Sequence, residues 1–472
     1  MKRILLFAMA STLVFASCRK IQVDGDGSSN NSGGGTVVTP GSTILSGTIG
    51  TDMTLRSGTT YTLRGIVYVA NGAQLTIEPG VTILGDKGSR GTLVITRGCR
   101  INASGTAASP IVFTSSEGAN ARSGDWGGIV ILGRAKTNAT YNGQAGLGEA
   151  EGGINNGDGY GLFGGTDDND NSGTLKYVRI EYAGYAFLPD KELNGIGLYA
   201  VGKGTTISYV QVAWAADDSF EWFGGSVNAD HLIAYKGLDD DFDTDNGFSG
   251  KVQFAIAIRD SSVADVSGSN GFESDNDAAG SMLTPQTSAV FANVTSVGPK
   301  ETVTSIGNTY YRNAAQIRRN SSLSVINSVF LGWSNGLLID ASTGRPTDLN
   351  TAGATPTLWW RGNIIAGVPS VSNQVKYSAS TAQPTGWTAA DALAWHNTPS
   401  FNNLLLASNS AVGYAAAFNY SNPDLAPAAT SPLLTGAYTS ADARLSGLQT
   451  VAYRGAVGPN DNWYKGWTRY GN

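Results

Sequence analysis

A repeat of about 22 residues runs through the middle of the chain and limits what it can fold into. Phe220 and Phe242 lie 22 residues apart in the similar segments DDSFEWFGG and DDDFDTDNG, and Phe272 follows 30 residues later. A second set of apolar segments, spaced by 22 residues, is centred on Val210, Leu232 and Phe254. This period, with two or three short strands per repeat, is typical of a parallel β-solenoid, in which each coil stacks on the previous one.

The composition supports an all-β fold. Glycine accounts for 62 of the 472 residues, and charged residues make up 14% of the chain, against roughly 25% in an ordinary globular protein. Few charges together with many Gly, Asn and β-branched residues are typical of a protein built from short strands and turns. The net charge of −6 and the lack of a basic cluster argue against nucleic-acid binding.

The N-terminus predicts export and attachment of a lipid. MKRILLFAMASTLVFASC places basic residues before a short apolar run, which predicts a signal peptide at residues 1–17. Its ending, FASC, resembles a bacterial lipobox with Phe15 in place of the usual Leu, which implies cleavage before Cys18 and a diacylglyceryl group on its thiol. An ordinary signal peptide is the alternative. Residues 18–42 follow as a polar Gly/Ser/Asn tether, so we expect a protein held at a membrane through Cys18.

The chain resembles right-handed parallel β-helix lipoproteins of Bacteroidetes-type Gram-negative bacteria, which have a pectin-lyase-like solenoid. The resemblance lies in LTIEPGVTILG, LVITRGCRINASGT, DWGGIVILGRA and NADHLIAYKGLDDDFDTDNGFSGKVQF, and it covers the chain from about residue 43 to residue 472. It implies an all-β, right-handed, single-stranded parallel β-helix, which we place at residues 43–374, anchored to the outer membrane on its cell-surface or periplasmic face. The group has no firmly assigned activity.

The C-terminal part differs from the repeat region. Residues 375–472 show no clear 22-residue period and hold several prolines, so we expect an irregular cap packed on the solenoid. Within it, TGWTAADALAWHN at residues 385–397 starts with a threonine that can cap a short helix. We expect His396, which stands alone here, to serve packing or the surface, and Cys99 to be a small buried residue.

The repeat places one carboxylate from each of three coils in a column. If Phe220, Phe242 and Phe272 point into the core, the residues that follow them point outward, because strand side chains alternate. Those residues are Glu221, Asp243 and Glu273. They would lie about 4.8 Å apart along the stack. Like charges at this distance repel, so a bridging cation, a bound proton or full solvation must relieve the repulsion.

A bound Ca²⁺ is one interpretation of the acidic residues, because an oxygen-rich cluster with few bases suits this ion. The candidate ligands are Glu221, Asp241, Asp243, Asp245, Glu273 and Asp275. A second, partial calcium-loop pattern contains Asp168 and Asp170, with Arg179 where the loop would end in Glu.

The structural interpretation of the same residues needs no ion. Asp and Asn side chains cap turns by accepting backbone hydrogen bonds. Asp218, Asp240 and Asn270 share one column just before the strand, and we expect them to form such a ladder at a solenoid corner.

Three functions are compatible with these features. The leading hypothesis is non-catalytic binding of a glycan or another extended ligand, with Tyr182, Trp214 and Trp333 as aromatic ligand-binding candidates on exposed strands. The second is a polysaccharide lyase or hydrolase that uses Asp243 with Glu221 or Glu273, since hydrolysis needs a pair of carboxylates. The third is a structural or adhesive surface protein. Two histidines in the whole chain argue against a His-based triad or a zinc site, and the pattern does not predict the oligomeric state.

Overall fold

The computed structural model describes residues 41–188 and 191–471. The predicted signal peptide, the lipidation site Cys18 and nearly all of the tether at 18–42 lie outside the described residues. Among the helices described, none is long and apolar enough to cross a membrane.

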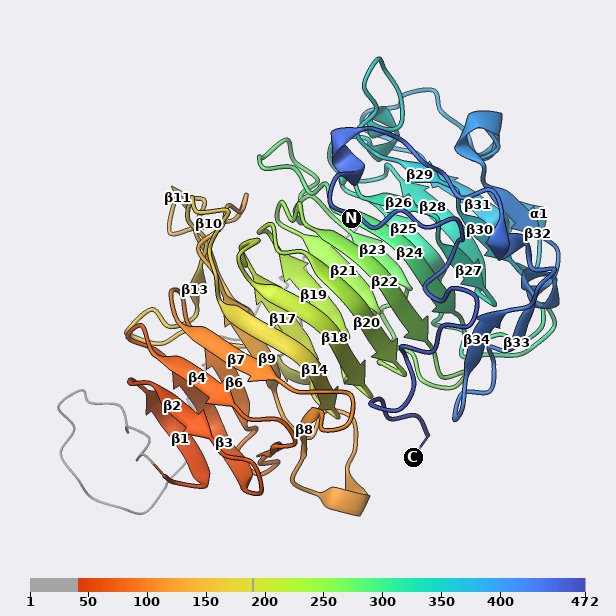
Figure 1. Cartoon of the computed structure of the whole chain (residues 1–472). Helices are drawn as coiled ribbons and strands as arrows, with labels where there is room; N and C mark the ends of the chain where they lie inside the picture. Colours follow the sequence, from red (N-terminus) through yellow and green to blue (C-terminus); the bar gives the residue numbers. More distant parts are fainter. Residues whose placement is uncertain (1–40, 189–190, 472) are drawn as a thin grey trace, which may run out of the picture. The chain divides into compact units, whose positions relative to one another are not determined.

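The chain folds into a right-handed parallel β-helix, as predicted (Figure 1). Each coil contributes strands to three stacks, and the strands in every stack pair in parallel. Together they form one 26-stranded sheet that winds around a continuous apolar core. Backbone groups of one coil therefore bond to the coils before and after it, while the apolar side chains of all coils share one interior.

The first stack contains β2 (Met53–Leu55), β4 (Gln74–Ile77), β7 (Arg100–Ser104), the first halves of β14 (Gly173–Glu181), β18 (Thr206–Ala213), β20 (Ala229–Tyr235), β22 (Lys251–Ile258) and β24 (Val290–Val297), then β26 (Ser324–Ile326) and β29 (Trp360–Arg361). The second stack contains the first halves of β1 (Ile44–Ile49) and β3 (Thr60–Val69), then β5 (Thr82–Gly85) and β8 (Ile111–Ser115), the second halves of β14 to β24, and β27 (Val329–Leu331), β30 (Ile364–Ala366) and β32 (Leu404–Leu406).

The third stack carries most of the predicted acidic site. It contains the second halves of β1 and β3, then β6 (Thr92–Ile95), β9 (Gly128–Leu132), β17 (Ile196–Tyr199), β19 (Phe220–Phe223), β21 (Phe242–Asp245), β23 (Phe272–Ser274), β25 (Asn313–Ile317), β28 (Asn335–Asp340) and β31 (Val375–Ser378).

Short antiparallel hairpins and short helices lie outside the three stacks of the solenoid. The hairpins are β10 (Thr140–Tyr141) with β11 (Gln144–Ala145), β12 (Gly148–Glu149) with β13 (Leu162–Phe163), β15 (Tyr185–Leu188) with β16 (Lys191–Leu193), and β33 (Tyr414–Ala416) with β34 (Asp424–Pro427). The α-helices are α1 (Val371–Gln374) and α2 (Ala389–His396), and the 3₁₀ turns are η1 (Gly118–Asn120), η2 (Thr347–Asn350), η3 (Pro399–Phe401), η4 (Asn409–Val412), η5 (Pro432–Leu434) and η6 (Ala443–Leu445).

The predicted register holds in the third stack. Phe220 pairs with Phe242, and Phe242 with Phe272. All three rings are fully buried, with centroids 5.8 and 5.2 Å apart. The eight extra residues between the last two therefore form a loop and leave the stack intact.

The predicted alignment of Phe254 with Leu232 in the neighbouring coil is wrong by one residue. Leu232 pairs with Ala255, not with Phe254. Phe254 has a left-handed backbone, with φ of 59°, at the bend where β22 passes from the first stack to the second. Tyr177, Tyr209 and His231 bend their strands in the same way. A bend residue points out of the coil, so an apolar ring at this position does not mark the core.

The solenoid continues past the predicted boundary at residue 374, because β31 and β32 still pair in parallel with the preceding coil. The predicted short helix is α2. Its N-cap is Thr388, which forms a capping box with Asp391. His396, the last residue of α2, is fully buried, with Nδ1 3.1 Å from Asn397 Oδ1, and burial lowers the pKa of its imidazole to about 4. Cys99 is also buried.

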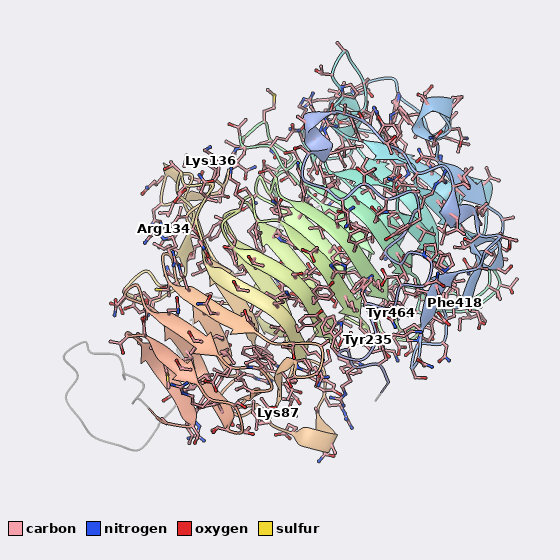
Figure 2. The ribbon with its side chains drawn as sticks, viewed as in Figure 1. Lys87, Arg134, Lys136, Tyr235, Phe418 and Tyr464 are labelled. Carbon is pink, nitrogen blue, oxygen red and sulfur yellow. The ribbon has the colours of Figure 1, made fainter. Side chains whose placement is uncertain are left out.

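Residues 436–471, which we call the C-terminal segment, run back over the first and second stacks (Figures 1 and 2). In Figure 2, Tyr464 of this segment and Tyr235 of β20 mark the region where the two meet, and both belong to one apolar cluster. Much of this face of the solenoid is therefore covered by the chain itself.

Candidate functional site

The predicted carboxylate column is present. Glu221, Asp243 and Glu273 occupy matching positions of β19, β21 and β23. The residues that follow them, Trp222, Thr244 and Ser274, point inside and are fully buried. The alternation deduced from the repeat therefore places these three acids on the outside of the third stack.

A second ladder lies at the corner just before these strands. The Asp218 carboxylate accepts a hydrogen bond from the backbone N–H of Asp240 at 2.8 Å. Asp240 in turn accepts from the N–H of Asn270, and Asn270 Oδ1 accepts from the N–H of Asn313 at 3.1 Å. Each side chain thus ties its corner to the next coil, and the predicted corner role of Asp218, Asp240 and Asn270 is confirmed.

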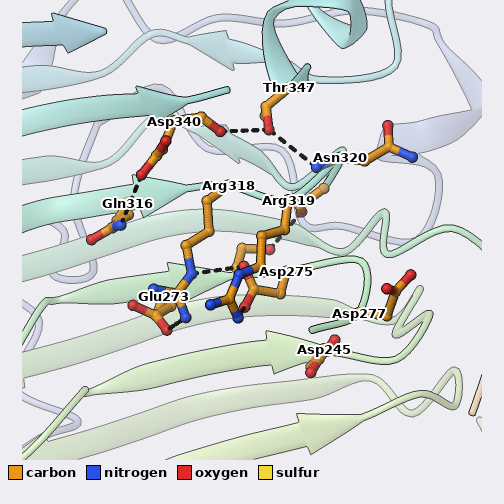
Figure 3. Close-up of polar contacts among 12 residues, drawn as sticks. Asp245, Glu273, Asp275, Asp277, Gln316, Arg318, Arg319, Asn320, Asp340 and Thr347 are labelled. Carbon is orange, nitrogen blue, oxygen red and sulfur yellow. Dashed lines mark hydrogen bonds and ion pairs between the residues drawn. The ribbon is translucent and has the colours of Figure 1, made fainter. Parts of the chain in front are cut away.

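Two arginines compensate one end of the acidic column (Figure 3). Arg318 forms ion pairs with Glu273 and with Asp275, the latter at 2.8 Å. Arg319 binds the other oxygen of Asp275, also at 2.8 Å. Sequence reasoning missed both, because it looked for bases near the acids along the chain. They follow Ile317, and continuing the register from β23 to β25 by one residue would have found Arg318.

Other predicted metal ligands also have partners of their own. Asp241 pairs with Arg259 at 2.8 Å, and both side chains are completely buried. Asp168 pairs with Lys136 at 2.7 Å, whereas Asp170 is buried and accepts from Ser172 Oγ at 3.3 Å. The structure therefore does not gather Asp168 and Asp170 with the acidic column.

The remaining carboxylates crowd together. Three overlapping groups have carboxylate oxygens within 4.8 Å of one another: Asp217 with Asp218 and Asp239, Asp218 with Glu221 and Asp243, and Asp240 with Asp243 and Glu273. Their environment favours the protonated form. Burial, followed by the neighbouring charges, raises the pKa of Glu221 and of Asp243 well above the usual values.

The loop that contains β10 to β13 lies against this acidic surface and adds a further acid. Thr137 Oγ1 donates to the carbonyl of Asn246 at 2.9 Å, and Asn138 Nδ2 to that of Asn276 at 2.8 Å, which fastens the loop to the solenoid. Burial, followed by the charge of Asp245, raises the pKa of Glu151 to about 7. Glu221, whose pKa the charge of Glu151 also raises after burial, is only 9% exposed, so this part of the column is enclosed.

The donor set of this cluster fits a hard cation. Its members offer oxygen ligands, which Ca²⁺ prefers. Asn194 donates to Glu221 through Nδ2, whereas its own Oδ1 is buried without a hydrogen-bond partner, as is Asp243 Oδ1. Asp218, Glu221, Asp243 and Asn194 are thus the residues best placed to hold an ion.

Two of the predicted aromatic residues meet in a cleft of about 590 Å³. Tyr182 follows β14 and Trp214 follows β18, and their rings stack with centroids 4.8 Å apart and planes inclined by 10°. Both residues have left-handed backbones, with φ of 62° and 55°. Such strained positions in consecutive coils turn the two rings to the same side of the solenoid.

Cationic groups surround these rings. Arg122, Lys236 and Arg469 line the cleft, with Asp260 as the lining carboxylate. The Arg469 guanidinium lies 5.1 Å from the centre of the Trp214 ring and 5.6 Å from that of Tyr182. Lys236 is paired with Asp260 at 3.1 Å. The cleft thus combines an aromatic floor with an excess of positive charge, in contrast to the acidic column.

The prediction that the three aromatic candidates lie exposed on strands is wrong: only 9% of Tyr182 and 8% of Trp214 is accessible, at the edge of the cleft, and Trp333 is not accessible at all. Its ring is fully buried, and its Nε1–H donates to Ser296 Oγ at 3.1 Å. Trp333 therefore belongs to the core, where indoles more often pack.

A comparison with protein-family models decides the family. The model described as the pectate-lyase-like β-helix domain matches residues 47–392. The chain belongs to this pectate-lyase-like β-helix family. No curated protein and no solved structure matches the chain in the corresponding comparisons.

Within this pectate-lyase-like β-helix, the cationic side of the cleft was not foreseen. Arg122, Lys236 and Arg469 come from segments far apart in the sequence, and Arg469 lies beyond the matched residues. The one available signal was the ending YRGAVGPNDNWYKGWTRY, rich in aromatic and basic residues. Its position over β14 and β18 does not follow from any repeat.

Proposed function

We propose that the protein is a lipid-anchored β-helix of the cell envelope that binds an acidic glycan at the Tyr182–Trp214 cleft without cleaving it. The observation that carries this proposal is the stacked aromatic pair beneath the Arg469 guanidinium. The cleft volume of about 590 Å³ lies within the roughly 300–1,000 Å³ of small-molecule sites. It can accept one or two residues of a polymer that continues over the surface.

The chemistry of the cleft supports a carboxylated sugar. Aromatic rings can pack on the C–H faces of a sugar, and guanidinium groups bind carboxylates through paired, charge-assisted hydrogen bonds. Arg122 and Arg469 are available for this, because Arg122 is exposed and 39% of the Arg469 side chain is accessible. The family name refers to pectate, a polymer of such sugars, which agrees with the cationic lining.

Binding assays with polygalacturonate test the proposal. We expect Trp214→Ala to weaken binding of oligogalacturonates at least tenfold, as measured by isothermal calorimetry. Trp387→Ala is the matched control, because Trp387 packs edge to face on Tyr377 near α2 and lines no part of this cleft. Equal affinities of wild type and Trp214→Ala, or no binding across acidic and neutral polymers, would leave a structural or adhesive role.

We also propose that Ca²⁺ binds the acidic column and stabilises it. The support is the group formed by Asp218, Glu221 and Asp243, together with the unpartnered oxygen of Asn194. A cation would relieve the repulsion among these charges at neutral pH. Calcium titration of protein stripped with EDTA is the test, with no change in melting temperature as the outcome that rejects the ion.

The anchoring proposal rests on Cys18 and the tether that follows it. A lipid on Cys18 would hold the solenoid at the outer membrane while the tether leaves it free to reach a polymer. Metabolic labelling with palmitate should mark the wild-type protein and not Cys18→Ser. Protease treatment of intact cells then separates a cell-surface location from a periplasmic one.

A second candidate function, a polysaccharide lyase or hydrolase, is favoured by one observation. The carboxylate oxygens of Glu221 and Asp243 lie within 4.8 Å, and both pKa values are raised. Such a pair can share acid and base roles. Incubation with polygalacturonate and other acidic polymers, followed by product analysis of wild type and Asp243→Asn, decides the matter: catalysis requires products that disappear in the variant.

A further inference from the structure

The C-terminal segment is fastened to the solenoid by side-chain amides that act like strand backbone. Gln253 both donates to the carbonyl of Gln449 and accepts from its N–H, each at 2.8 Å. Gln211 holds Arg469 in the same paired way, at 2.9 and 2.8 Å. An amide side chain offers one donor and one acceptor side by side, as a peptide group does. The segment is therefore fixed to the solenoid at Gln449 and again at Arg469.

A further pair fixes the start of the segment, where Asn327 binds both the N–H and the carbonyl of Tyr438. Its far end is held by Tyr235, whose hydroxyl accepts from the N–H of Gly471 at 3.0 Å. Gln211 holds the backbone of Arg469 itself, and Tyr235 holds the chain two residues later. These contacts fix the backbone of Arg469 next to the Tyr182–Trp214 cleft.

The Arg469 side chain is oriented as firmly as its backbone. Its Nη1 pairs with Glu181 Oε2 at 2.7 Å, and Arg179 Nε lies 3.0 Å from the other oxygen of the same carboxylate. Two guanidinium groups thus share a single negative charge, which leaves a net positive charge at this wall of the cleft. The Glu181 side chain is 2% exposed, and that of Arg469 is 39% exposed, so Arg469 is the member that a ligand can reach.

We propose that Arg469 is the specificity-determining residue of the cleft, and that the C-terminal segment forms one wall of the cleft and holds the Arg469 guanidinium there. The inference rests on the proposed glycan function of the same site. Arg469 would form a charge-assisted pair with the ligand carboxylate, while Gln211 and Glu181 position it. Because the ligand contacts the segment, binding stabilises the docked segment, and docking in turn strengthens binding.

The test uses the full-length protein and two probes, oligogalacturonate and its methyl ester, in which each carboxylate is replaced by an uncharged ester. Arg469→Ala should weaken binding of the acid about ten- to hundredfold and leave the ester nearly unchanged. Arg469→Lys should keep part of the preference, because the charge remains and the planar fork is lost. Arg444→Ala is the matched control: this arginine of the same segment stacks on Trp359 at 4.0 Å and lines no part of the cleft.

Hydrogen exchange provides a second readout. The acid should slow exchange of residues 463–471 in the wild type and should not do so in Arg469→Ala. If the wild type binds the acid, and Arg469→Ala keeps the wild-type ratio of the affinities for acid and ester, the inference about Arg469 is overturned while the proposed function stands. If Trp214→Ala binds both probes like the wild type, or if the wild type binds neither, the proposed function falls and the inference falls with it.

Discussion

The Asp218 carboxylate accepts the backbone N–H of Asp240, its counterpart one coil later, at 2.8 Å. Asp240 repeats this contact with Asn270, and Asn270 repeats it with Asn313. Along this ladder, two carboxylates and then an amide oxygen accept the backbone N–H of the next coil. The contact itself requires only an acceptor oxygen. Burial, followed by repulsion from the neighbouring acids, raises the pKa of Asp218 and of Asp240 well above the usual value, so an ionised carboxylate at either position would be destabilising.

Asp240→Asn and Asp240→Ala should consequently change the free energy of unfolding by different amounts or in opposite directions. Alanine leaves the buried N–H of Asn270 without its acceptor, which should lower the free energy of unfolding by about 1–3 kcal/mol. Asparagine keeps the acceptor and cannot ionise, so it should be neutral or stabilising. Urea unfolding at pH 7 in EDTA measures both. Equal destabilisation by the two variants would show that the charge itself is needed.

Arg318→Met should destabilise the protein more than Arg319→Met. Arg318 pairs with both Glu273 and Asp275, whereas Arg319 pairs with Asp275 alone. Loss of one partner of a buried pair costs about 3–5 kcal/mol, and a side chain 23% exposed should fall near the lower end. Chemical denaturation at neutral pH compares the two variants. The reverse order would mean that Arg318 does not compensate the column.

The repeat made the third stack predictable because each coil places the same kinds of residue at the same positions there. A phenylalanine fills the interior and the next residue must face outward, so Phe242 and Asp243 could be placed from their neighbours one coil away. The same logic failed at Phe254. The bend residue of each long strand takes a left-handed backbone and points outward, and an aromatic ring there has the same appearance in the sequence as a core residue.

The Tyr182–Trp214 cleft could be predicted only in part. Tyr182 and Trp214 were named from residue type, but their stacking depends on two left-handed turns in successive coils. Arg469 could not have been placed. Its partners Gln211 and Glu181 lie more than 250 residues earlier in the sequence, and contacts made by a non-repeating segment leave no periodic signal.

The buried pair of Arg259 and Asp241 should tolerate a double substitution better than a single one. Arg259→Met leaves the Asp241 carboxyl fully buried without its guanidinium partner, which should lower stability by about 3–5 kcal/mol. Adding Asp241→Asn removes the uncompensated charge and should recover part of this loss. A double-mutant cycle in thermal unfolding measures the coupling. Additive effects would indicate that the two groups stabilise the corner independently.

The crowded carboxylates predict that the protein becomes less stable as the pH rises from about 5 to 8. Burial is the main cause that raises the pKa of Asp239 to about 6 and those of Glu151 and Asp245 to about 7. Unfolded Asp and Glu titrate near pH 4, so above that pH the folded chain holds more protons than the unfolded chain. The stabilisation is complete below the unfolded pKa and is lost as the pH rises through the folded values, by about 1.4 kcal/mol per pH unit for each extra proton.

Calcium should reverse part of this loss, because the pKa values of Asp218, Glu221 and Asp243 are raised as well, and a cation competes with protons for their oxygens. In stripped protein, added Ca²⁺ should raise the melting temperature clearly at pH 8 and little at pH 5, where the carboxyls hold protons. Asp243→Asn should abolish the calcium effect and flatten the pH profile. Asp168→Asn is the control, since Asp168 pairs with Lys136 outside the column. A melting temperature that calcium leaves unchanged at pH 8, with the pH dependence intact, would show that protons alone relieve the repulsion between Asp243 and its neighbours.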